Sequence, residues 1–157
     1  MSQNNLSSDE RWLAALSHAA VLIPTLGLFA PLIVWVTRRE KSDFLRFQSL
    51  QALTYQVILL LVWVVLGVLL GLLFIAISLT TAIVALYLQS QTPFIILSIS
   101  EFVFFAFLLV LMGLGVVLGI IAAIACLNGS NFRYPLLGGW LEKLLHRSSK
   151  KEKVQHD

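Results

Sequence analysis

Only one charged residue, Glu101, lies between Phe47 and Phe132. A soluble domain cannot fold around such a stretch, because its surface needs charged and polar side chains to face water. The 157-residue chain is 59% apolar and 12% charged, against about 25% charged in an average soluble domain. Disorder is excluded for the opposite reason, since too much apolar surface needs burial. The composition predicts a small all-α integral membrane protein.

Three apolar runs, residues 12–36, 47–88 and 94–127, are each long enough to cross a hydrocarbon core of about 30 Å at about 1.5 Å per residue. Pro24 and Pro31 interrupt the first run, because proline removes a backbone donor and clashes with the preceding turn. This run is either one bent span or a re-entrant hairpin of two half-helices, and we favour the bent span.

Residues 47–88 have the length for two crossings, but no polar turn marks a reversal near Gly71. Basic residues also favour one crossing. They lie in the loop 37–46 (Arg38, Arg39, Lys41 and Arg46) and in the tail (Arg133, Lys143, Arg147, Lys150, Lys151 and Lys153). A single crossing places both groups in the cytoplasm, as the positive-inside rule requires. We therefore predict three spans in the cell membrane, with the N-terminus outside and the C-terminus in the cytoplasm.

This topology divides the chain into a polar tail (1–11), a transmembrane domain (12–132) and a basic tail (133–157). It leaves residues 72–100 as an apolar hairpin outside, which must lie in the interface or pack on a partner. After Pro135, leucines recur at helical spacing, with Trp140 as an aromatic anchor and Lys143 and Arg147 on the opposite face. The pattern predicts an amphipathic helix in the cytoplasmic interface.

Anionic lipid headgroups are the expected partners of the basic loop and tail. Nucleic acid is not expected, because binding it needs a basic face on a folded soluble domain.

Four stretches together resemble a known family: DERWLAALSHAAVLIP, LFAPLIVWVTRREKSDFLRFQSLQALTYQ, the glycine-bearing last run, and NGSNFRYPLLGGWLEKLL. They are similar to small bacterial multi-pass membrane proteins of unknown function, grouped distantly with the chloroplast inner-envelope import component Tic-twenty. The similarity covers about residues 9–145. In much of that family a histidine stands where this chain has Gln48. The resemblance implies a helical membrane fold and a role in translocation, and it assigns no active site.

Few polar residues fall within the predicted spans. Gln48, Gln51 and Tyr55 share one face of the second span, where they either bond to neighbouring helices or line a path. Glu101 is the one acid in the apolar region, and His18 lies at similar depth in the three-span topology. A pair between Glu101 and His18 is therefore one hypothesis, and a carboxylate stabilising a helix N-terminus is the other.

Glycines spaced four residues apart let helices approach closely. Two such pairs occur in the apolar runs, Gly67 with Gly71 and Gly115 with Gly119. They do not align in an antiparallel hairpin, so we expect them to contact different partners, such as the first span or another subunit.

Catalytic and metal-binding patterns are missing from the sequence, which contains no second intramembrane carboxylate, Cys/His cluster or Ser-His-Asp set. We therefore predict a protein that is not an enzyme and holds no cofactor or metal. The favoured function is an accessory or structural subunit of a membrane complex, partnered by another membrane protein or by further copies of itself. The alternative is a channel or protein-translocation component.

Overall fold

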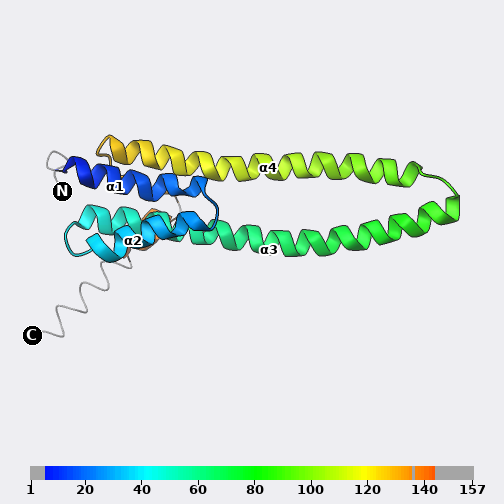
Figure 1. The fold of residues 1–157 in the computed structure, drawn as a ribbon, viewed down its shortest axis with the longest axis horizontal. Coiled ribbons are helices and arrows are strands. Elements are labelled where there is room, and N and C mark those ends of the chain that lie inside the picture. Colours follow the sequence, from blue (N-terminus) through cyan, green and yellow to red (C-terminus); the bar gives the residue numbers. More distant parts are fainter. Residues whose placement is uncertain (1–5, 136, 144–157) are drawn as a thin grey trace, which may run out of the picture. The chain divides into compact units, whose positions relative to one another are not determined.

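The computed structural model describes residues 6–135 and 137–143, and no β-strand occurs among them. The elements are α1 (Ser8–Ala19), the 3-10 turns η2 (Ala20–Leu22) and η3 (Leu26–Leu28), α2 (Phe29–Arg38), α3 (Asp43–Leu88) and α4 (Thr92–Leu127) (Figure 1). Residues 137–143 are also helical. The all-α prediction is confirmed. Two compact units divide these elements: one runs to Leu60 and resumes at Val116, and the other is Leu61–Gly115.

In the first unit, the opening apolar run folds back on itself. α1 and α2 lie side by side and antiparallel, joined through η2 and η3 (Figure 1). Thr25 turns the chain with a φ of 65°, directly after Pro24, which cannot continue a helix. Gly27 packs against the carbonyl of Ala20 so closely that any Cβ would collide with it. The prediction of one bent span across residues 12–36 is wrong, and the hairpin alternative is the one found.

The hairpin also changes where the N-terminus lies. Ser42, in the α2–α3 loop, is close enough to the Glu10 carboxylate near the start of α1 to lower its pKa, and the guanidinium of Arg11 lies beside Gly129, just after α4. The start of α1, the basic loop and the end of α4 therefore share one end of the first unit. The three-span topology separates the N-terminal tail from the basic loop by about 30 Å, whereas the start of α1 and the loop lie at one end here. The orientation of the chain in a membrane stays a prediction.

Small residues make up much of the hydrophobic core of the first unit. Its hydrophobic core comprises Ala14, Ala15, Val34, Leu45, Ala123 and Cys126. The large apolar side chains point outwards instead: Trp12 is 66% exposed, Phe29 57% and Ile33 59%. This is the reverse of a soluble protein, in which the large apolar side chains fill the interior.

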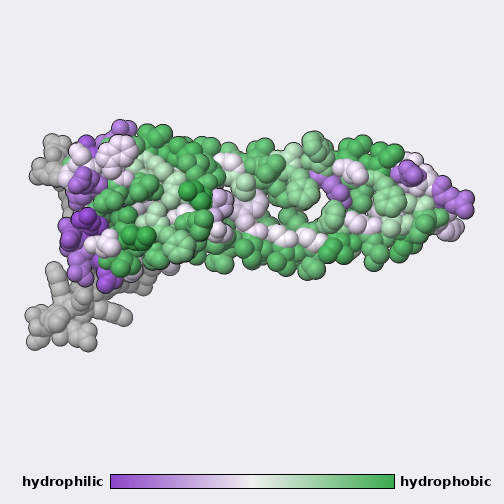
Figure 2. All heavy atoms as spheres, viewed as in Figure 1, coloured by the Kyte–Doolittle hydropathy of each residue, from purple (hydrophilic) through white to green (hydrophobic). Residues whose placement is uncertain are grey.

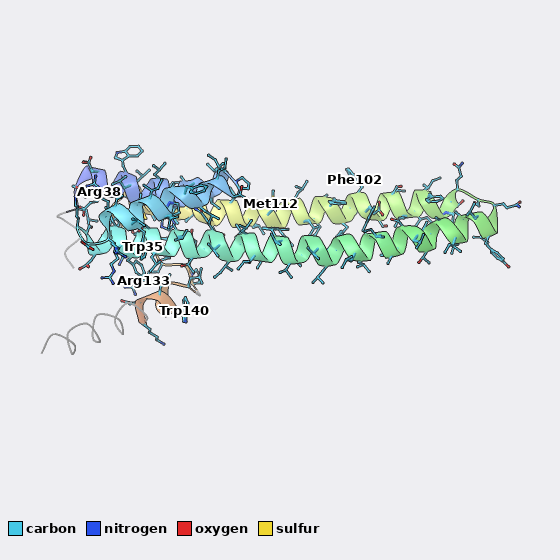
Figure 3. All side chains as sticks on the ribbon, turned by 60° about the horizontal axis from the view of Figure 1, so that its bottom comes forward. Trp35, Arg38, Phe102, Met112, Arg133 and Trp140 are labelled. Carbon is cyan, nitrogen blue, oxygen red and sulfur yellow. The ribbon has the colours of Figure 1, made fainter. Side chains whose placement is uncertain are left out.

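The second unit is a helical hairpin of the last part of α3 and the first part of α4. α3 is one continuous helix through Leu88, so the two-crossing alternative, with a reversal near Gly71, is excluded. No residue in its most apolar stretch is buried, and both α3 and α4 are long and apolar enough to cross a membrane. Apolar side chains cover both helices, and hydrophilic ones gather near the α3–α4 turn (Figure 2). Phe102, on α4, is 76% exposed and extends outwards (Figure 3).

Candidate functional site

Buried polar side chains gather where α1 packs on α3 in the first unit. They are Ser17, His18, Gln48, Ser49, Gln51 and Gln56, each no more than 7% exposed. Both serine hydroxyls donate to carbonyls one turn back in their own helices, Ser17 to Leu13 and Ser49 to Leu45. His18, Gln48 and Gln56 connect different elements, and they form the candidate site.

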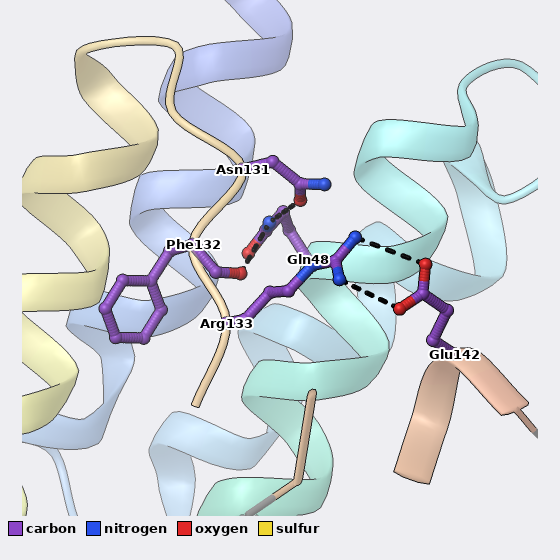
Figure 4. Close-up of polar contacts among 5 residues, drawn as sticks. All are labelled: Gln48, Asn131, Phe132, Arg133 and Glu142. Carbon is purple, nitrogen blue, oxygen red and sulfur yellow. Dashed lines mark hydrogen bonds and ion pairs between the residues drawn. The ribbon is translucent and has the colours of Figure 1, made fainter. Parts of the chain in front are cut away.

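Gln48 is the centre of this network. Its Nε2 donates to Asn131 Oδ1 at 2.7 Å and to the Phe132 carbonyl at 3.1 Å (Figure 4). A carbonyl can only accept, so these bonds fix which end of the amide is nitrogen. The opposite end, Oε1, lies 3.0 Å from His18 Nε2 and 3.5 Å from Cys126 Sγ. Gln48 therefore ties α3 to α1, to α4 and to the segment after α4.

The amide orientation also settles the tautomer of His18. Gln48 Oε1 can only accept, so His18 Nε2 carries the proton and donates it. Neutral His18 then accepts through Nδ1 from the Tyr134 hydroxyl, 3.3 Å away. Burial raises the pKa of the Tyr134 hydroxyl well above its ordinary value, which keeps its proton in place as the donor. One chain of hydrogen bonds thus runs from Tyr134 through His18 to Gln48 and Asn131.

Aromatic rings close the site from the side of the segment after α4. Tyr55 stacks on Tyr134 with ring centres 4.2 Å apart and planes 9° from parallel. Phe132 meets Tyr134 edge to face at 5.0 Å and approaches His18 at 6.3 Å. Offset and edge-to-face pairs add about 0.5–1.5 kcal/mol each beyond burial. They hold residues 131–134 over the polar network.

The polar residues predicted to share one face of the second span have different partners. Gln48 and Tyr55 join the site, as described. Gln51 is 0% exposed, and neither polar atom of its amide has a hydrogen-bond partner within the described residues. Gln56, which the sequence did not single out, donates to the Ser17 carbonyl at 3.0 Å. This face is packed inside the first unit.

His18 and Glu101 do not form the pair considered from the sequence. Both ring nitrogens of His18 are used by Gln48 and Tyr134, so neither remains for a carboxylate. Glu101 belongs to the second unit. Its Oε1 is buried and has no hydrogen-bond partner within the described part of the chain.

The two glycine pairs differ in how closely other parts of the chain pack against them. Gly119 packs against Val21 and the His18 carbonyl so tightly that a Cβ would collide with Val21. Gly115 is buried. Nothing lies within 4 Å of a Cβ built on Gly67 or Gly71, so this pair makes no close helix contact within the described chain.

Beyond the network, Arg133 and Glu142 form a two-bond ion pair at 2.9 and 3.2 Å (Figure 4). It fastens the helical residues 137–143 to the segment after α4. Trp140 is 55% exposed and Lys143 is exposed. Arg147 lies outside the described residues, as does most of the predicted amphipathic helix, so its place in the membrane interface stays a prediction.

Sequence reasoning missed the residues contributed after α4: Asn131, Phe132 and Tyr134. The available signal was a polar and aromatic cluster, NFRYP, separated by three residues from the end of an apolar run. Only the fold shows that this cluster turns back over His18 and Gln48. Chemically, the network is a set of neutral, mutually satisfied hydrogen bonds. Among residues 6–135 and 137–143, no three His, Cys, Asp or Glu side chains could hold a metal ion together.

A family model described as the magnetosome magnetite crystal formation protein family matches residues 9–141. The chain belongs to this family. The family consists of small magnetosome membrane proteins involved in magnetite crystal formation, which agrees with the predicted membrane location. The comparisons give no support for the expected link to Tic-twenty. No curated protein and no solved structure matches the chain.

Proposed function

We propose that this protein is a non-enzymatic, multi-pass membrane protein, a structural subunit of a membrane complex in which magnetite crystals form. The observation that carries the proposal is a distribution of side chains opposite to that of a soluble protein. Small and polar residues make up much of the interior of the first unit, while many large apolar side chains of both units are exposed. Such a surface needs lipid or another membrane protein around it.

In this proposal, α3 and α4 cross the bilayer, and the α1–α2 hairpin enters from the end that carries the charges. A re-entrant segment is tolerated in a membrane only where protein covers its irregular backbone. Gly119 of α4 packs against part of it, through contact with Val21 and the His18 carbonyl, and residues 22–26 at the turn are exposed. The basic loop (37–46) then faces anionic headgroups on the side of the membrane where α1 begins.

The buried network supports a structural role over a conducting one. A path for ions or peptides would need Gln48 and Gln51 to face an open space, but both are 0% exposed. α1 and residues 131–134 occupy the face that a path would use. The polar side chains therefore hold elements together.

Alkaline carbonate extraction of membranes from cells producing the chain tests the membrane assignment. We expect the protein to stay in the membrane pellet, and release into the supernatant would contradict the proposal. Purification in mild detergent followed by native mass spectrometry then tests the subunit role. A fixed stoichiometry with a partner supports it, whereas ion conductance by the purified protein in a planar bilayer would favour the channel alternative.

A further inference from the structure

In the hairpin of the second unit, both helices change from apolar side chains to a mixture of apolar and polar side chains part-way along their length. From Leu61 to Ile77, α3 has no side chain with a hydroxyl, amide or charge, and the same holds for α4 from Phe102 to Gly115. Towards the turn, polar residues begin on both helices. They are Ser78, Thr80 and Thr81 on α3, and Ser98, Ser100 and Glu101 on α4.

The two changes occur at the same height. Ser78 lies about 15 Å along α3 from its end at Leu88, and Glu101 about 14 Å along α4 from its start at Thr92, at about 1.5 Å per residue. Thr81 and Ser100 line one shallow pocket between the helices, which confirms that these levels face each other. Two independent stretches of sequence thus become polar at one level of the hairpin.

We propose that the hydrocarbon core of the bilayer ends at this level, and that residues 78–101 project beyond it on the side opposite the basic loop. This inference rests on the proposed function, in that α3 and α4 must cross a bilayer. The other arrangement would extend the core to the turn and hold Glu101 about 14 Å inside it.

Glu101 decides between the two arrangements. An ionised carboxylate is among the costliest groups to hold in hydrocarbon, and such residues normally pair with a base. The second unit contains no Lys, Arg or His, and Glu101 Oε1 has no hydrogen-bond partner among the described residues. At the edge of the core, water and headgroups supply the missing partners.

The helix lengths permit this placement. A core of about 30 Å that ends at Ser78 takes about twenty residues of α3 at about 1.5 Å per residue, so its other face lies near Ile58. Gln56, which bonds to the Ser17 carbonyl near the end of α1, lies next to this face. The exposed apolar residues nearest this level, Leu79 (64%) and Ile99 (62%), fit the headgroup layer, which extends about 5–7 Å beyond the core.

Thiol accessibility tests the inference on the full-length chain. The native cysteine, Cys126, is buried at 0% exposure and is replaced in the background variant Cys126→Ala. Ser98→Cys, Val68→Cys and Gln91→Cys are then made singly and reconstituted into phosphatidylcholine–phosphatidylglycerol vesicles. A hydrophilic maleimide is supplied on both faces of the membrane, and circular dichroism checks that each variant keeps its helix content.

We expect Ser98→Cys to react at least about tenfold faster than Val68→Cys and within about threefold of Gln91→Cys, because hydrocarbon excludes both the reagent and the thiolate. Ser98→Cys as slow as Val68→Cys, with Gln91→Cys fast, would overturn the boundary and leave the spanning helices intact. Fast labelling of Val68→Cys would overturn the proposed function itself. Slow labelling of all three would overturn the projection.

Discussion

Gln48 shows how a single side chain joins most of the first unit. Its amide donates to Asn131 and Phe132 and accepts from His18, all without contact with solvent. A buried donor or acceptor that loses its partner costs about 1–3 kcal/mol, which is more than the net gain from a typical hydrogen bond. Removing Gln48 therefore leaves several groups unsatisfied at once.

We predict that Gln48→Met lowers the free energy of unfolding by about 2–4 kcal/mol, because methionine fills the volume but bonds to none of these groups. SDS titration in mixed micelles, followed by tryptophan fluorescence, measures the change. Gln91→Met, in the exposed α3–α4 turn, is the matched control and is expected to change stability by less than about 0.5 kcal/mol. Equal effects of the two substitutions would contradict the role given to Gln48.

Tyr134→Phe isolates the next bond in the network. The ring keeps its stacking on Tyr55 and its contact with Phe132, and only the hydroxyl that bonds to His18 is lost. We predict a loss of about 1–2 kcal/mol in the same titration, because His18 Nδ1 is left as a buried acceptor without a donor. Tyr87→Phe, at a site that is 87% exposed, controls for the loss of a tyrosine hydroxyl and should be neutral.

The sequence predicted this site in part. His18, Gln48, Gln51 and Tyr55 were singled out because polar residues in apolar helices are costly and must have partners. That argument does not say which partners they have. Tyr134 lies 116 positions from His18, and the contact depends on residues 131–134 turning back over α1, which no local pattern specifies.

At the scale of the elements, one glycine on α4 sets how closely α1 and η2 can approach. We predict that Gly119→Ala lowers the free energy of unfolding by about 1–3 kcal/mol, because its Cβ would collide with Val21. Gly67→Ala, where nothing lies within 4 Å of the new Cβ, should be neutral or stabilising by up to about 1 kcal/mol, since alanine is the better helix former. Thermal unfolding of the two variants, compared in one detergent, tests the difference. Destabilisation of equal size in both would show that the contact with Val21 is not responsible.

The start of α1 is held by a capping box that also reaches the α2–α3 loop. Ser7 Oγ accepts from the Glu10 amide, and the Glu10 carboxylate accepts from the Ser7 amide. A hydrogen bond from Ser42, followed by those from Ser7, lowers the pKa of Glu10 from its ordinary value of 4.5. A lowered folded-state pKa means that the ionised form stabilises the fold. This stabilisation is complete above about pH 4.5 and is lost as the pH falls through the lower, folded-state pKa.

We therefore predict that Glu10→Gln lowers stability at pH 7 by no more than about 1 kcal/mol, since the group is largely solvated. The gap between the variant and the unmodified protein should narrow as the pH is lowered below about 4.5. Melting curves of both proteins across this range measure it, and titration of other carboxylates cancels in the difference. A gap that stays constant with pH would contradict the stabilising role of the ionised carboxylate.

The elements themselves were largely predictable. The long apolar runs gave α3 and α4, and the missing polar turn near Gly71 correctly indicated one continuous helix. The first run was misjudged because its length alone suits a crossing. Pro24 and the tight contact of Gly27 with the Ala20 carbonyl turn it into a hairpin, and a proline in sequence does not reveal whether a helix bends or reverses.

For the whole molecule, the α1–α2 hairpin changes which parts of the chain are expected on the same side of the membrane. The positive-inside rule still places the basic loop and the end of α4 on one side, but the start of α1 now lies at that same end through the Glu10–Ser42 contact. If α3 and α4 are the crossings, we predict that the start of α1, the basic loop and the end of α4 face the cytoplasm, and that the α3–α4 turn faces the opposite compartment.

Reporter fusions test this topology in cells. Alkaline phosphatase, which is active only outside the cytoplasm, should be active when fused after Gln91, in the turn between α3 and α4. The same enzyme fused after Asp157 should be inactive, and a green fluorescent protein placed before Met1 should fluoresce, because it folds in the cytoplasm. Phosphatase activity after Gln91 together with a dark N-terminal fusion would show that residues 12–36 cross the membrane, against the hairpin in the structure. Absence of phosphatase activity after Gln91, with the fusion protein present at normal levels, would show that α3 does not cross, and the exposed apolar surface of the second unit would then need a protein partner in place of lipid.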